Sequence, residues 1–160
     1  MRHRSFDVKV LFAGLLAISC NRAIRPDADN GGLFLPDGFG ALVVVDSLPG
    51  KARHIAVRDN GDIFVKGRHE VAGGNNWVLR DTDHDGKADT IRNFGSFTHE
   101  GSYSTGMRIY NGYLYTGSEK LVYRYRLEPG TLIPATAPEV IVADSGDRRE
   151  HMAKPFTFDG

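Results

Sequence analysis

The residues between 81 and 89 carry the clearest chemical pattern in the sequence. Carboxylates stand at positions 1, 3, 5 and 9 of this run and are supplied by Asp81, Asp83, Asp85 and Asp89. Glycine at position 6 permits a tight turn, and the backbone carbonyl of Lys87 adds an oxygen, so the loop suits a hard cation such as Ca²⁺. Position 12 is Arg92 rather than the glutamate of an EF-hand. We predict a structural Ca²⁺ loop on a hairpin; the alternative is a solvated acidic turn.

Three histidines are the candidates for acid–base chemistry, because each stands in a connection between repeated segments. They are His54, His99 and His151. The third has basic neighbours, Arg148, Arg149 and Lys154. This arrangement suits a general base beside an anion-binding cluster. The alternative is a hydrogen-bonded structural histidine in a solvated basic turn.

Short β-forming runs alternate with turn residues from residue 35 onward, and these elements must position the candidate residues. Pairs such as Asn111-Gly112 and Pro129-Gly130 supply the backbone angles of tight turns. No long window shows helical periodicity. The expected strands are 41–46, 54–58, 62–66, 76–80, 90–94, 106–110, 113–117, 121–127 and 139–144.

The chain also repeats itself, which favours one particular all-β architecture. Residues 55–65 align with 106–116 at a spacing of 51, residues 78–80 correspond to 122–124, and residues 156–160 begin a third copy. A period of about 50 residues with four strands per unit is typical of β-propeller blades. Closing the ring takes about four to eight blades. We therefore expect residues 35–160 to be an incomplete propeller of about two and a half blades, cut from a longer chain.

The first twenty residues are expected to be a signal peptide. Arg2 and Arg4 precede an apolar run over 8–18, which is too short to span a bilayer. The only cysteine, Cys20, follows a small residue as in a bacterial lipobox, so we predict its lipidation; the alternative is an ordinary signal peptide cut nearby. Residues 21–34 then form a flexible tether. The protein is predicted to be exported to the periplasm or cell surface, where it contacts the membrane only through this lipid.

Composition excludes several classes of function. The formal net charge is zero, which does not suit nucleic-acid binding. The sequence contains no phosphate-binding glycine loop, no zinc-spaced Cys/His set and no Gly-x-Ser-x-Gly elbow. Several aromatic residues alternate along the expected strands and are assigned to blade packing rather than to sugar stacking. These are Trp77, Tyr113, Tyr115, Tyr123 and Tyr125.

An ordered set of segments resembles one known family. They are Pro-Asp-Gly-Phe-Gly at 36–40, Leu-Pro-Gly-Lys-Ala-Arg-His-Ile-Ala-Val at 48–57, the block at 78–89, Gly-Tyr-Leu-Tyr at 112–115 with Val-Tyr-Arg-Tyr at 122–125, and the tail at 150–160. Together they resemble PQQ-dependent sugar dehydrogenases, most closely the sorbosone dehydrogenase-like branch. The resemblance covers residues 35–160.

The resemblance implies a six-bladed propeller that holds pyrroloquinoline quinone (PQQ) and Ca²⁺. It implies a sugar substrate and a cytochrome or quinone as electron acceptor. His151 matches the catalytic base, and Arg148, Arg149 and Lys154 are the cations available to the cofactor. Met-Ala-Lys follows His151 here, where the family has a glycine-rich stretch and an arginine. The remaining cofactor ligands of the family belong to later blades, so this chain alone is expected to be inactive.

Two other functions fit the same residues. One is a non-catalytic propeller lipoprotein that binds glycan or protein. The other is a lactonase-type propeller hydrolase, in which calcium in the channel activates an ester. Arginine and lysine residues that clamp a cofactor would favour the dehydrogenase, whereas a channel ring of acidic and amide side chains would favour the lactonase.

Overall fold

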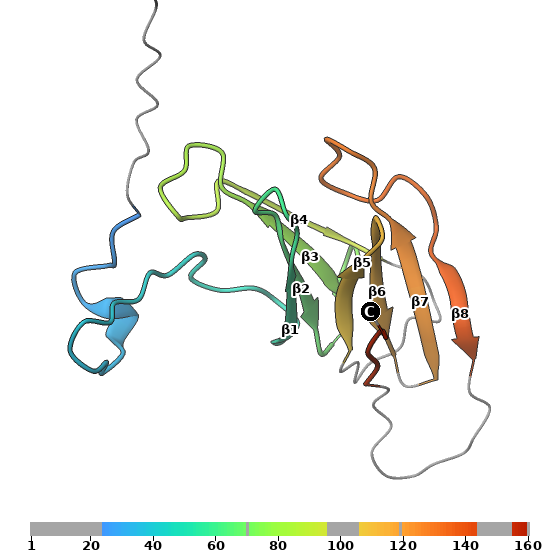
Figure 1. Ribbon diagram of the computed structural model, residues 1–160, viewed down its shortest axis with the longest axis horizontal. Coiled ribbons are helices and arrows are strands. Elements are labelled where there is room, and N and C mark those ends of the chain that lie inside the picture. Colours follow the sequence, from blue (N-terminus) through green and yellow to red (C-terminus); the bar gives the residue numbers. More distant parts are fainter. Residues whose placement is uncertain (1–23, 70, 96–105, 119, 144–154, 160) are drawn as a thin grey trace, which may run out of the picture.

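The fold is all-β, as the sequence predicts. A computed structural model describes residues 24–69, 71–95, 106–118, 120–143 and 155–159. Its described part forms two four-stranded antiparallel sheets (Figure 1). The first sheet contains β1 (Ala52–Val57), β2 (Ile63–Gly67), β3 (Asn76–Arg80) and β4 (Thr90–Phe94). The second contains β5 (Met107–Tyr110), β6 (Tyr113–Gly117), β7 (Leu121–Arg126) and β8 (Glu139–Ala143).

In each sheet, every strand pairs antiparallel with the next one along the chain. The shortest connection is the turn that follows β5. Between β5 and β6, Tyr110 pairs with Tyr113, and both residues of the turn, Asn111 and Gly112, have positive φ angles of 46° and 76°. That geometry matches the right-handed twist of the strands and explains the Asn-Gly pair. Eight of the nine expected strands are therefore confirmed, with boundaries shifted by at most two residues.

The hydrophobic core lies between the two sheets. The first sheet contributes Phe64, Val78 and Phe94, and the second contributes Met107, Leu114, Tyr123 and Tyr125, with Leu127 just after β7. Phe94 meets Tyr125 edge to face, with ring centroids 5.2 Å apart. The assignment of Tyr123 and Tyr125 to packing is confirmed, since both are buried. Each sheet thus buries one face against the other.

Polar contacts reinforce this packing at two points. Lys66 of β2 is fully buried, and its Nζ donates hydrogen bonds to Asn75 Oδ1 at 2.9 Å and to the Tyr123 hydroxyl at 2.7 Å. Arg58, just after β1, donates to the carbonyl of Glu128, just beyond β7, at 3.1 Å. The first strands of the two sheets, β1 and β5, lie in contact. The sheets are therefore joined along their initial strands as well as through their faces.

Strand pairing corrects two details of the predicted repeat. Phe64 and Tyr115 are aligned by the repeat, but Phe64 pairs with Val78 whereas Tyr115 pairs with Arg124. The structural counterpart of Val78 is therefore Arg124 and not Val122, a shift of two residues. The first strands shift by one residue, because the turn that follows β1 is longer than the turn that follows β5.

The predicted strand at 41–46 is wrong, because residues 41–46 pair with no strand in the part of the chain that the structure describes. The segment before β1 lies on the side of the first sheet away from the second (Figure 1) and contains one 3-10 turn, η1 (Asn30–Gly32). The amide of Val43 donates to Asp27 at 2.7 Å, and the carbonyl of Val44 accepts from Ala88 at 2.9 Å. Residues 24–34 of the predicted tether thus include an anchored aspartate.

Candidate metal centre in the 81–89 loop

The acidic loop connects β3 to β4 and is held at both ends. At its base the amide of Asp89 donates to the carbonyl of Arg80 at 3.0 Å. Arg80 is itself fixed by Asp62 of the neighbouring turn, since its Nε and Nη2 each reach one carboxylate oxygen at 2.6 Å. The sequence closes the loop with two residues of positive φ, His84 at 62° and Gly86 at 92°. The loop therefore has a defined shape on a rigid hairpin.

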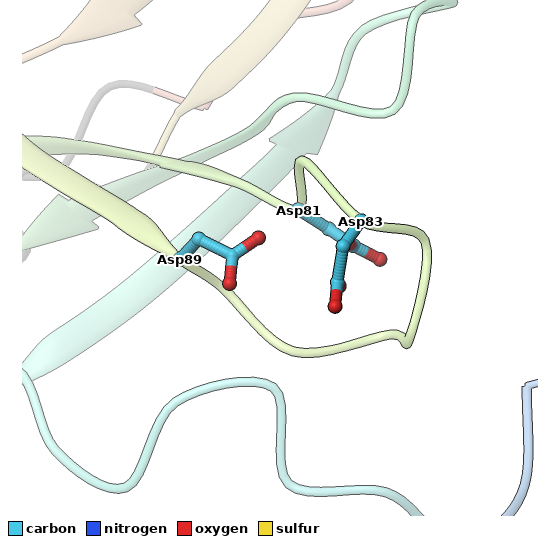
Figure 2. Close-up of side chains that lie close together, drawn as sticks. All are labelled: Asp81, Asp83 and Asp89. Carbon is cyan, nitrogen blue, oxygen red and sulfur yellow. The ribbon is translucent and has the colours of Figure 1, made fainter.

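Three of the predicted metal ligands lie together. Oxygen atoms of Asp81, Asp83 and Asp89 lie within 4.8 Å of one another. Figure 2 shows Asp81 and Asp83 on the β3 side of the loop, with Asp89 reaching towards them from the β4 side. Three carboxylates at this separation match the donor chemistry of Ca²⁺, which takes six to eight oxygens and completes its shell with carbonyls and water.

The other two predicted ligands behave differently. Asp85 is outside the group, and its Oδ1 accepts from the amide of Lys87 at 2.7 Å. The Lys87 ammonium lies 3.0 Å from Asp27. A ligand role for the Lys87 carbonyl stays a prediction. Three of the four predicted carboxylates therefore lie together, and a ligand role for Asp85 stays a prediction.

Hydrogen bonds lower the pKa of two of the clustered carboxyls, Asp81 and Asp89. Burial would raise the pKa of Asp81, but amide donors from Gly86 and His84 outweigh it and lower that pKa. The amide of Thr82 and then its hydroxyl, both 2.7 Å from Asp89 Oδ2, lower the pKa of Asp89. Both carboxyls are anionic at neutral pH, as a cation site requires.

Asp27 helps to fix the position of the 81–89 loop, a role that the sequence did not reveal. It accepts from the Val43 amide and pairs with Lys87, so it joins the segment before β1 to the acidic loop. The Val43 amide, followed by the Lys87 ammonium, lowers the pKa of Asp27. No signal marks this role in the sequence, because Asp27 stands in a polar stretch that reads as a tether.

The predicted catalytic and cofactor residues lie outside the described part of the chain. These are His151, Arg148, Arg149 and Lys154, together with His99 and the predicted lipidation site Cys20. Of the three connection histidines the structure describes only His54, which lies on β1. Burial, followed by the nearby charges of Arg53 and Arg108, lowers the pKa of His54. His54 is therefore neutral at pH 7 and able to accept a proton, but the convergence of the three histidines stays a prediction.

Within the described residues, no helix has the length and apolar character that crossing a membrane requires. Comparisons with family models, with curated proteins and with solved structures found no match to this chain. The fold class therefore rests on the structure itself, and the family resemblance rests on the motifs.

Proposed function

We propose that the two sheets are successive blades of a β-propeller. Each has four antiparallel strands in chain order, they pack face to face, and their first strands lie in contact. This is the relation that radial repetition of blades produces. A ring of about four to eight blades needs further sheets, from additional sequence or from other copies.

The segment 155–159 supports this arrangement. Its Phe158 stacks on Tyr110 of β5 and meets Tyr115 of β6 edge to face, with both pairs of ring centroids 4.6 Å apart. Tyr115 lies on the face of the second sheet that points away from the first. The start of the third repeat thus contacts the second sheet on the side where a further blade belongs.

We further propose that the propeller belongs to an exported, lipid-anchored protein. This protein uses PQQ to oxidise sugars or related alcohols and aldehydes. The observation that carries it is the ordered set of motifs over residues 35–160, which resembles the sorbosone dehydrogenase-like branch of quinoproteins. The near-neutral charge and repeated four-stranded sheets agree with that class. The electrons pass to a cytochrome or quinone.

Each predicted site residue has a role in this proposal. When PQQ is bound, it supplies the two-electron acceptor for the substrate carbon. His151 accepts the proton of the sugar hydroxyl, since an imidazole titrates near neutral pH. Arg148, Arg149 and Lys154 are cations, and the carboxylates of PQQ are anions, so the donor chemistry fits.

The 81–89 loop has a structural role, which is separate from the calcium of the cofactor. Ca²⁺ held by Asp81, Asp83 and Asp89 would neutralise three carboxylates and fix the β3–β4 connection. Because Asp27 bonds to Lys87 of the same loop, the ion would also stabilise the segment before β1.

A spectroscopic titration with PQQ in the presence of Ca²⁺, on the chain extended by the later blades that the resemblance implies, tests the proposal. We expect saturable binding that weakens at least about tenfold, or about 1.4 kcal/mol, when Arg148 and Arg149 are both changed to Gln. Arg126→Gln is the matched control, because Arg126 is exposed and pairs only locally with Glu128 at 2.7 Å. Absence of PQQ binding, together with hydrolysis of a lactone or retention on a glycan array, would favour one of the two alternatives.

A further inference from the structure

Two arginines on the first strands of the two sheets carry charges that no described carboxylate neutralises. Arg53 lies on β1 and Arg108 on β5, and both side chains are exposed. Neither forms an ion pair with any residue in the described part of the chain. Other cations of that part do have acidic partners, namely Arg80, Lys87, Arg124 and Arg126. The charges of Arg53 and Arg108 are therefore available to a ligand.

His54 lies on the face of the first sheet that points towards the second. It is directly opposite Lys66 in the pairing of β1 with β2, and opposite residues of an antiparallel pair share a face. Lys66 reaches the Tyr123 hydroxyl of the second sheet at 2.7 Å, which identifies that face as the inner one. Strands β1 and β5 lie side by side (Figure 1). The half-buried imidazole of His54 thus lies where the first strands of the two sheets meet.

A β-bulge in β1 brings Arg53 to the same level as His54. Ala52 pairs with Gly67 and His54 pairs with Lys66, so Arg53 is an extra residue between two consecutive partners on β2. A bulge interrupts the alternation of side chains along a strand and redirects one of them, and such bulges are common beside functional sites. Arg53 and His54 therefore both lie opposite Lys66, at the start of β1.

The charges of these side chains act on one another across the two sheets. Burial lowers the pKa of His54, and the charges of Arg53 and then Arg108 lower it further. Arg108 Nη1 donates to the carbonyl of Met107 at 3.1 Å, which steadies the guanidinium and leaves its other N–H donors for a ligand. Like charges gathered without a counter-ion repel one another, and a bound anion would remove that repulsion.

We propose that Arg53, His54 and Arg108 form a binding site for a small oxyanion, a carboxylate or phosphate group, at the junction of β1 and β5. Guanidinium groups present paired N–H donors that fit the oxygens of either group. The imidazole of His54 adds a hydrogen bond, and a positive charge when it is protonated. The site is formed by the two described sheets, so it requires no later blade. It uses different residues from the PQQ proposal, whose cations lie within 148–154.

An NMR pH titration of the histidines of the chain tests the proposal. In sodium phosphate or sodium gluconate, the pKa of His54 should lie about one pH unit higher than in sodium chloride of the same ionic strength, because a bound oxyanion stabilises the imidazolium. His84, exposed in the acidic loop, is the internal control and should titrate alike in all three salts. Tighter binding of phosphate than of gluconate would identify a phosphoryl ligand, and the reverse would identify a carboxylate.

Substitution of the two arginines tests which residues hold the anion. Arg53→Gln with Arg108→Gln should weaken binding of the preferred oxyanion at least about tenfold, and in chloride it should raise the pKa of His54 because the repelling charges are gone. Arg92→Gln, at an exposed position on β4, is the matched control and should change neither.

Two results would overturn the proposal. One is a pKa of His54 that is the same in phosphate, gluconate and chloride, and the other is a double variant that binds the oxyanion as tightly as the wild type. The comparison of salts needs no variant, so it decides the question even where the double variant does not fold. No PQQ is present, so a failure here is distinct from a failure of the sugar-oxidation proposal.

Discussion

At the scale of single residues, the spacing of the aspartates in the acidic loop indicated the type of donor atom. It did not indicate which of these side chains lie together. Four carboxylates at alternating positions suggested four ligands, but only three lie together. The reason is local: His84 and Gly86 both have positive φ, and the turn leaves Asp85 beside the amide of Lys87. Sequence spacing could not reveal this, because the backbone conformation of His84 is uncommon for a residue with a side chain.

The calcium prediction assigns the ion to the three clustered carboxylates and not to Asp85, so substitutions in the two groups should affect calcium binding differently. Calcium at about 0.1–1 mM, the range of extracellular modules, should raise the melting temperature of the wild type. Asp81→Asn and Asp89→Asn should lower calcium affinity at least about tenfold, because each removes a charged ligand. Asp85→Asn is the matched control and should keep the calcium effect. An equal loss in all three variants would contradict the three-residue set.

A second prediction concerns Asp62, which is buried beside Arg80. Burial would raise the pKa of Asp62, but hydrogen bonds from Arg80 and then Asn60 outweigh it and hold the pKa low. The stabilisation is therefore complete above the unfolded-state pKa of about 3.9 and is lost as pH falls through the folded-state pKa. Asp62→Asn should cost about 3 kcal/mol of unfolding free energy at pH 7.

Denaturant unfolding at pH 7 and pH 3 checks this dependence. The difference between wild type and Asp62→Asn should shrink at the lower pH, as Asp62 approaches protonation. Asp59→Asn, an exposed position in the same turn, should change little at either pH. A difference that is the same at both pH values would show that the ion pair does not account for it.

At the scale of elements, strands could be predicted almost completely, because turn residues and β-forming runs act locally. The run at 41–46 was the failure. Its alternating apolar residues look like a strand, but Val43 and Val44 bond to Asp27 and Ala88 instead of to a neighbouring strand. The predicted correspondence between the third strands of the two repeats, β3 and β7, was also displaced by two residues. The reason is that the connections between strands differ in length between the repeats. Both errors concern long-range partners, which local patterns do not encode.

At the same scale, Asp27 holds the segment before β1 against the 81–89 loop. Its removal should make that segment more mobile. Asp27→Ala deletes the acceptor of the Val43 amide and the partner of Lys87. We expect limited proteolysis within residues 24–46 to accelerate, while the two sheets stay protected. Asp37→Ala, an exposed position in the same segment, is the control. Equal cleavage of both variants and the wild type would contradict an anchoring role.

At the scale of the whole molecule, the packing of the two sheets was predictable only in outline. The 51-residue repeat indicated two similar units, but it did not indicate that a buried lysine would join them. Lys66 reads as an ordinary polar residue at the end of a strand, yet it is fully buried and bonds to Tyr123 of the other sheet. The candidate catalytic residues were reached through family resemblance, and they remain predictions.

A double-mutant cycle measures this contact between the sheets. Lys66→Met and Tyr123→Phe each remove one partner of the 2.7 Å hydrogen bond. If the sheets pack as described, the two changes should be coupled by about 1–2 kcal/mol of unfolding free energy, because contacting groups are not additive. Coupling near zero would contradict face-to-face packing at this point.

The central claim, that these sheets belong to a propeller that oxidises sugars with PQQ, is tested most directly by dye-linked turnover. The chain, extended by the later blades that the resemblance implies and loaded with PQQ and Ca²⁺, is supplied with aldoses and sorbosone while reduction of an artificial electron acceptor is followed. The account predicts turnover that His151→Ala abolishes while PQQ binding stays nearly intact. Absence of dye reduction with every sugar, or turnover unchanged by His151→Ala, would contradict it.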